Sequence, residues 1–158
     1  MYDGSEKTFE MAVRKSSTDV IAVIEGKIML LMQEQPGKEI FPSLPGGGVE
    51  DGETPQEAAT RELLLETGYA GDLTLVDEFF GHALFFHESV FVAKNCRKIA
   101  EPHPDEGERI KVTFTTFEEF LQLCRDQKFA VPIGLKFRMY EALVDEKKKL
   151  ELKLLLGV

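Results

Sequence analysis

One stretch of the sequence, residues 44–69, constrains the fold more than any other. It is a glycine-rich loop followed by a short segment with clear helix signals. Thr54 can cap the helix, Pro55 suits the first helical position because its missing N–H would be unpaired there, and Glu57 can complete a capping box. Gly68 is typical of a helix end, because glycine adopts the left-handed conformation without a Cβ penalty. The pattern predicts a helix between Thr54 and Gly68.

Two glutamates on this expected helix are candidate metal ligands. Glu62 and Glu66 are four residues apart, so their side chains lie one above the other on the same face. Most such pairs are a solvated acidic face, although stacked like charges destabilise a helix. A divalent cation would remove the repulsion, because Mg²⁺ prefers carboxylate oxygens and shares its coordination shell with substrate phosphates. The preceding glycines, Gly46 to Gly48, favour the metal, since they let the backbone approach a ligand and offer a carbonyl oxygen.

The spacing of these residues resembles the Nudix box at its full length. The matching positions are Gly47, Glu53, Arg61, Glu62, Leu63, Glu66 and Gly68. The chain departs from the pattern at one position, where Leu65 replaces the first of two consecutive glutamates. A leucine cannot ligate a metal, so we expect the site to hold fewer metal ions, or to hold one more weakly, than a complete box does.

The resemblance implies a fold and a metal site. The fold is an α/β/α sandwich with a mixed β-sheet. The metal is Mg²⁺, with Mn²⁺ as an alternative, and its ligands are Glu62, Glu66 and the carbonyl near Gly46. The resemblance also implies that Glu53 and Arg61 form an ion pair that braces the loop against the helix.

Features beyond the box resemble one branch of the family, the ADP-ribose and nucleotide-sugar pyrophosphatases. These enzymes carry a glutamate in a late acidic loop that acts as a base or as an additional ligand. The acidic loop of this chain is residues 105–108, so Glu106 and Glu108 are both candidates. Residues 79–93 are also similar and include Glu88 as a candidate substrate-loop residue. However, the proline that this branch usually carries in the segment is absent.

The function implied by the resemblance is cleavage of the diphosphate in a nucleoside diphosphate linked to another group. ADP-ribose or a nucleotide sugar is the expected substrate, attacked by a metal-activated water. Two alternatives stay open. The box alone does not define the substrate, so the chain could be a nucleoside triphosphate pyrophosphohydrolase of the MutT type. Leu65 favours the other alternative, a nucleotide-binding regulator without hydrolysis.

Length and charge narrow the class of protein. The 158 residues fit a single domain with one core. The net charge of -9 speaks against a nucleic acid or an anionic membrane as partner. Cys96 and Cys124 have no metal-ligand spacing and indicate thiols in a reducing compartment. We find no signal peptide or membrane span and therefore expect a cytoplasmic protein. The resemblance adds a homodimer as an expected assembly.

Hydrophobic patterns predict the other elements of this single domain. An N-terminal arm, residues 1–17, contains an alternating segment typical of a strand. The tail, residues 145–158, fits either a strand or a helix, with extension of the preceding helix favoured. Residues 33–45 are expected to form a loop. The expected strands are 8–14, 19–25, 27–32, 72–81, 87–94 and 109–117, and the expected helices after the box are 117–127 and 133–147.

Overall fold

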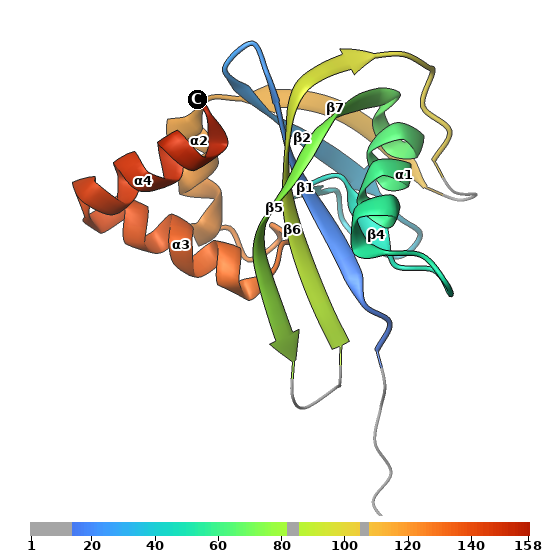
Figure 1. The fold of residues 1–158 in the computed structure, drawn as a ribbon, viewed down its shortest axis with the longest axis horizontal. Coiled ribbons are helices and arrows are strands. Elements are labelled where there is room, and N and C mark those ends of the chain that lie inside the picture. The colour runs from blue at the N-terminus through green and yellow to red at the C-terminus, as the bar shows by residue number, and fades with distance from the viewer. Residues whose placement is uncertain (1–13, 82–85, 105–107) are drawn as a thin grey trace, which may run out of the picture.

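The computed structural model describes residues 14–81, 86–104 and 108–158. Within these residues, seven strands form one mixed sheet with helices on both faces (Figure 1). The strands are β1 (Ser17–Ile24), β2 (Lys27–Glu34), β3 (Phe41–Ser43), β4 (Gly46–Gly48), β5 (Tyr69–Gly81), β6 (Phe86–Lys98) and β7 (Arg109–Thr115). The helices are α1 (Pro55–Thr67), α2 (Phe117–Gln122), a 3-10 turn (Leu123–Arg125), α3 (Ile133–Val144) and α4 (Glu146–Leu156).

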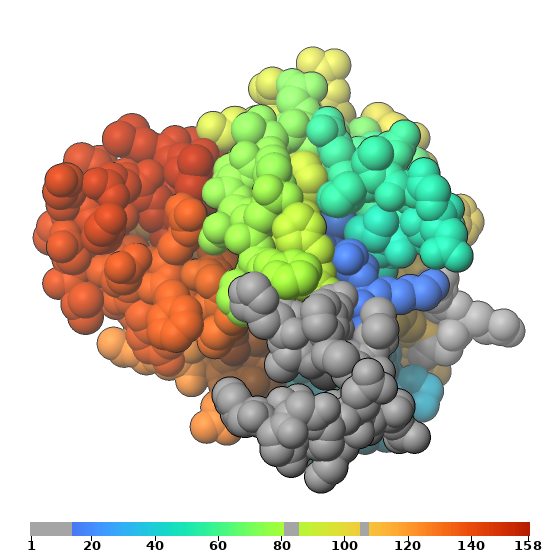
Figure 2. Space-filling model, turned by 60° about the horizontal axis from the view of Figure 1, so that its bottom comes forward, coloured from blue at the N-terminus to red at the C-terminus, as the bar shows by residue number. Residues whose placement is uncertain are grey.

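The helices form two layers around the sheet. Figure 2 shows α3 and α4 on one side of the β5 edge and α1 on the other. The side chains of β1 alternate between these layers, as expected for a strand buried on both faces. Val20 and Ala22 pack in one cluster with Leu63 of α1, whereas Ile21 packs in the other with Met139 of α3. The expected α/β/α sandwich is therefore confirmed.

The sheet opens at one end, and this opening positions the site. β1 and β2 form a hairpin, but their paired residues lie only next to the turn, at Val23 with Ile28 and at Ile24 with Lys27. Further from the turn, β1 pairs instead with β4 on one side and runs parallel to β6 on the other. β2 pairs there with β3 and β7. The glycine loop therefore lies directly beside the start of β1, in the space between the diverging strands.

Several expected elements are confirmed, and their local chemistry explains them. The hairpin turns at Glu25 and Gly26, which both have positive φ, as a tight two-residue hairpin turn requires. The strands expected at 72–81 and 87–94 are present but longer, as β5 and β6. Cys96 and Cys124 are both free thiols. None of the helices in the described part of the chain is long and apolar enough to cross a membrane.

Other expectations were wrong, or they concern residues outside the described ranges. Residues 33–45 are not all loop, because β2 extends to Glu34 and the short strand β3 pairs with it. The helix expected over 117–127 ends as an α-helix at Gln122. The expected strand 8–14 lies mostly outside the described residues, and Ser17, assigned to the N-terminal arm, already belongs to β1.

The C-terminal tail is a separate helix and not an extension of α3. Asp145 has extended backbone angles, φ -134 and ψ 113, which interrupt the helix. Its side chain accepts hydrogen bonds from the backbone N–H groups of Lys147 and Lys148, so it caps α4. The tail forms a helix, in line with the helical spacing of its leucines, and Leu152 and Leu156 are buried against the core.

Candidate active site

Helix α1 begins and ends where its capping residues predict. The Thr54 hydroxyl accepts a hydrogen bond from the backbone N–H of Glu57, and the Glu57 carboxylate accepts one from the N–H of Thr54. Gly68 has φ 75 and ends the helix in the left-handed conformation. This gives Glu62 and Glu66 fixed positions on one helical face.

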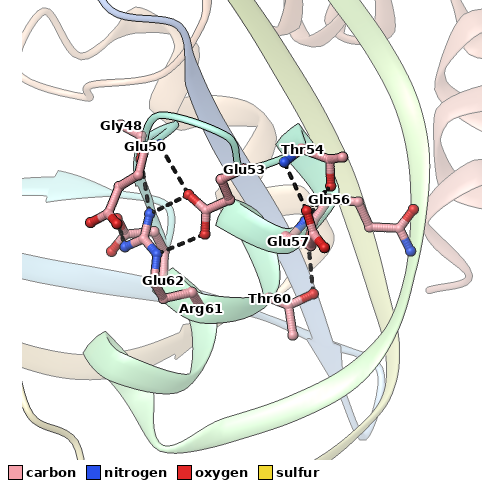
Figure 3. Close-up of polar contacts among 9 residues, drawn as sticks. All are labelled: Gly48, Glu50, Glu53, Thr54, Gln56, Glu57, Thr60, Arg61 and Glu62. Carbon is pink, nitrogen blue, oxygen red and sulfur yellow. Dashed lines mark hydrogen bonds and ion pairs between the residues drawn. The ribbon is translucent and has the colours of Figure 1, made fainter.

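Arg61 ties the glycine loop to the helix. Its Nε and Nη2 atoms donate to both carboxylate oxygens of Glu53, each at 2.9 Å (Figure 3). Nη2 also donates to the carbonyl of Gly48 at 3.0 Å, and Nη1 donates to Glu62 at 2.7 Å. The hydrogen bonds from Arg61 lower the pKa of Glu53 to about 2, helped by the backbone N–H of Glu50. The guanidinium of Arg61 thus contacts Gly48 in the glycine loop, Glu53 just before the helix and the candidate ligand Glu62.

This arrangement yields a testable expectation for Arg61→Lys. Lysine keeps the charge but cannot reproduce the bidentate contact and the Gly48 contact together. We expect turnover to fall about tenfold or more, because Glu62 is then held less firmly. Loss of a residue that orients a metal ligand typically costs ~10–100-fold in metal affinity or activity. Steady-state kinetics would measure the loss. Arg138→Lys is the matched control, because Arg138 pairs with Asp77 away from this site, and an equal loss in both variants would contradict the bracing role.

Glu66 is a buried carboxylate with only neutral hydrogen-bond donors. It is 6% exposed and accepts hydrogen bonds from the N–H of Gly46 at 2.8 Å and from Nε2 of Gln33 at 3.4 Å. Burial is the main reason that its pKa rises to about 8, against the effect of the Gly46 hydrogen bond. Nearby negative charges also raise the pKa, and they are carried by Glu62, Glu108 and Asp19. The environment of Glu66 therefore suits a cation.

Glu62, Glu66 and Glu108 line the same hollow, which we call the first pocket. Its volume is about 330 Å³. Glu108 reaches it from the start of β7, where its Oε1 accepts a 2.9 Å hydrogen bond from Nε2 of Gln35. Leu65 also lines the pocket, beside the two helix glutamates. The complete lining is Gln33, Gln35, Gly46, Gly47, Gly48, Glu62, Leu65, Glu66, Pro104 and Glu108.

The glycine loop touches the candidate ligands at close range. A Cβ atom added to Gly47 would lie 2.3 Å from Oε1 of Glu62, so only glycine leaves room for that carboxylate. Among the described residues, no group of three or more acidic, histidine or cysteine side chains is placed to hold a metal ion alone. Two glutamates would therefore need further oxygen ligands, such as a loop carbonyl or the phosphates of a substrate. Glu106, the other candidate base, lies outside the described residues.

A second pocket of about 410 Å³ adjoins the first. The two share Gln33, Gln35, Gly46 and Gly47 as lining residues. Glu88 lines this second pocket and not the first, and it lies 3.7 Å from Arg14 in an ion pair. The structure thus brings Glu62, Glu66, Glu108 and the glycines together, and it places Glu88 in the neighbouring hollow.

Comparisons with known proteins identify the family of the chain. A model of the NUDIX domain matches residues 13–133. The chain belongs to the Nudix family. An ADP-ribose pyrophosphatase of Bacillus subtilis (strain 168) is 33% identical over 132 residues, which cover 80% of this chain and 71% of that protein. As a Nudix protein, the chain is a hydrolase that acts on phosphoric anhydride bonds.

Solved structures support the Nudix fold. An ADP compounds hydrolase has a TM-score of 0.70 at 18% identity, with 92% of this chain and 82% of that chain covered. The E. coli ORF135 protein has a TM-score of 0.63 at 19% identity, with 86% of this chain and 94% of that chain covered. At such identities the likeness concerns the fold alone.

Sequence reasoning missed three polar residues that line these two pockets, Asp19, Gln33 and Gln35. Asp19 begins the apolar run of β1, between the buried residues Thr18 and Val20. A charged residue at such a place was a usable signal, because carboxylates are rarely set into a buried strand without a reason. Gln33 and Gln35 carried no comparable signal, since their position beside the glutamates depends on how β2 meets the glycine loop.

Proposed function

We propose that this Nudix hydrolase is Mg²⁺-dependent and cleaves the diphosphate of a nucleoside diphosphate linked to a second group. ADP-ribose or a nucleotide sugar is the proposed substrate class. The observation that carries the proposal is the buried carboxylate of Glu66, which lies near Glu62 and Glu108 without a nearby counter-charge of its own among the described residues. The name of the Bacillus subtilis relative, an ADP-ribose pyrophosphatase, supports the substrate class.

In this proposal, Glu62, Glu66 and the carbonyl of Gly46 would hold the Mg²⁺ ion, with Mn²⁺ as an alternative. A divalent ion bound there supplies positive charge to the diphosphate and makes a nearby water more acidic. Arg61 keeps Glu62 in place through its 2.7 Å contact, and Gln33 and Gly46 keep Glu66 in place. The negative net charge of the chain would then not prevent diphosphate binding, because the cation dominates the local field.

In this proposal, Glu108 is the candidate base among the described residues. It lines the first pocket together with the helix glutamates, and the hydrogen bond from Gln35 orients its carboxylate. A base in this position would accept the proton of the attacking water. The electron pair of that water forms the new P–O bond, and the bridging oxygen leaves with the other phosphate. ADP-ribose would yield AMP and ribose 5-phosphate. Glu106 stays a candidate for the same role.

The test is a substrate panel of ADP-ribose, nucleotide sugars, dinucleotides and nucleoside triphosphates, each with Mg²⁺ or Mn²⁺. Release of AMP from ADP-ribose, or of nucleoside monophosphate from a nucleotide sugar, is the expected result. Turnover confined to triphosphates would replace the proposal with the triphosphate pyrophosphohydrolase alternative. Tight binding of ADP-ribose without turnover at either metal would favour a regulator. The absence of nucleic-acid and membrane partners, the cytoplasmic location and the homodimer stay predictions.

Leu65 allows a prediction in which a substitution adds a metal-ligating carboxylate. Its side chain lines the first pocket beside Glu62 and Glu66. We expect Leu65→Glu to raise Mg²⁺ affinity about tenfold, because hard cations are bound more tightly as carboxylate ligands are added. Calorimetric titration of Mg²⁺ into the substrate-free protein would measure this. Thr60→Glu is the matched control, since it adds the same charge at an exposed position of α1. Unchanged affinity in Leu65→Glu would mean that the site is not merely short of one carboxylate.

A further inference from the structure

We infer that the part of the second pocket around Asp19 and Glu88 binds the hydroxyl groups of the sugar in the substrate's second group. This inference rests on the proposed function and assigns a place to the group beyond the diphosphate. It makes Asp19 a binding residue for that sugar, with Glu88 as its neighbour.

Strand pairing places the two carboxylates on one face of the sheet. Asp19 lies opposite Val90, and Ser17 lies opposite Glu88, in the parallel pairing of β1 with β6. Residues paired in this way, and residues two apart along a strand, share a face. Because Val90 packs in the same cluster as Met139 of α3, Asp19 and Glu88 point to the α3 side of the sheet. The helix glutamates of the first pocket approach from α1, on the other side.

The carboxylate of Asp19 has no hydrogen-bond donor among the described residues. Within residues 14–81, 86–104 and 108–158, no hydrogen bond reaches its carboxylate, although the residue is half-buried in the pocket. Ser43, another lining residue, is 5% exposed, and its hydroxyl has no hydrogen-bond partner in the same described part of the chain. Buried polar groups in folded proteins are normally paired. Two such groups in one pocket indicate a ligand that brings hydrogen-bond donors.

The charges of the surrounding side chains limit which kind of ligand can bind beside Asp19. Asp19 and Glu88 repel one another, and Arg14, which pairs with Glu88, is the cation that offsets them. A further phosphate group would meet two carboxylates here, so an anionic group is disfavoured. Sugar hydroxyls suit the place, because they are uncharged and can donate hydrogen bonds to carboxylate oxygens.

The position of the second pocket limits which part of the substrate can reach Asp19 and Glu88. Its shared lining with the first pocket, at Gln33 and Gly46 for example, lets a group directly linked to the diphosphate enter it. Phe41 also lines this pocket, and its aromatic ring, with Lys38 5.6 Å from the ring centroid, is the part of the lining that suits a base. Asp19 and Glu88 therefore fit a sugar better than the base, and we assign them to the sugar of the second group, which the choice of substrates below separates from the sugar of the nucleoside.

The test compares three substrates in wild type and in Asp19→Asn: ADP-ribose, its analogue with 2-deoxyribose as the second sugar, and its analogue with 2′-deoxyadenosine. We expect Asp19→Asn to lower kcat/KM for ADP-ribose about 10–100-fold, mainly through KM, the range for losing a hydrogen bond to a charged group. Wild type should show a similar loss on the second-sugar analogue and none on the nucleoside analogue. In Asp19→Asn, the two sugar forms should become nearly equal.

Other outcomes separate the inference from the proposed function. An equal loss on all three substrates in Asp19→Asn would overturn the inference, since it would mean a structural effect or an effect on the metal. A wild-type loss on the nucleoside analogue alone would also overturn it. Absence of turnover of ADP-ribose by wild type would contradict the proposed function itself. Glu78→Gln is the matched control, because Glu78 lies on β5 opposite Ser89, the residue after Glu88, but outside both pockets, and it should retain wild-type preference.

Discussion

The Glu66→Gln variant is expected to lose Mg²⁺-dependent turnover by on the order of 10²–10³-fold, because a metal ion contributes several kcal/mol of transition-state charge stabilisation. Glutamine has the same shape and can still accept the hydrogen bond from Gly46. The change therefore removes the charge and the oxygen that accepts from Gln33, while it keeps the contact with Gly46. Single-turnover kinetics over a range of Mg²⁺ concentrations would measure the loss. Glu141→Gln, an exposed change on α3, should leave the rate unaltered.

The same variant should be more stable than wild type when no metal is bound. The pKa of Glu66 is raised from its ordinary 4.5 to about 8, so the folded state retains a proton that the unfolded state releases above pH 4.5. Wild-type stability in a chelator therefore falls as pH rises from about 4.5 to about 8. Glutamine does not titrate and avoids this loss.

Thermal unfolding in a chelator at pH 5 and at pH 8.5 would test the stability difference. The two proteins should be close in Tm at pH 5, and Glu66→Gln should have the higher Tm at pH 8.5. Each kcal/mol of stability corresponds to a shift of about 2–4 °C for a chain of this size. A lower Tm for the variant at both pH values would mean that Glu66 is a structural residue, and near wild-type turnover would contradict its assignment as a ligand.

The box could be predicted from the sequence because its determinants are local. Helix α1 depends on Thr54, Glu57 and Gly68, which all act within one or two turns of the residues they affect. The same local spacing places Glu62 and Glu66 on one face. Hydrophobic alternation likewise predicts the hairpin of β1 and β2, since buried positions follow the strand period of two.

Long-range contacts explain what could not be predicted. The contacts of Glu66 come from distant parts of the chain, since Gly46 lies 20 residues earlier and Gln33 lies 33 residues earlier. Gln35 and Glu108 are 73 residues apart, and their hydrogen bond depends on the pairing of β2 with β7. The break before α4 lies at Asp145, which caps the helix through its side chain, although the apolar spacing around it continues through the break. Asp19 becomes part of a pocket only once β1 lies beside β6.

The Gly47→Ala variant is expected to lose most of its turnover while it stays folded. The new Cβ would lie 2.3 Å from Oε1 of Glu62 and 2.5 Å from its Cδ, so that side chain must move. The clash involves the end of a flexible side chain, so the cost to stability is small. For catalysis the cost is large, because a displacement of about 1 Å in a positioned group can lower a rate by ~10²-fold.

Gly48→Ala is the control that separates this steric effect from a general effect on the loop. A Cβ at Gly48 would meet no atom within 4 Å. Both variants add one methyl group to β4, and neither glycine has a left-handed φ, so backbone strain does not distinguish them. Turnover and Mg²⁺ affinity should fall in Gly47→Ala and stay near wild type in Gly48→Ala. Equal activity in the two variants would mean that the contact between Gly47 and Glu62 does not position a ligand, and the metal assignment would then depend on Glu66 alone.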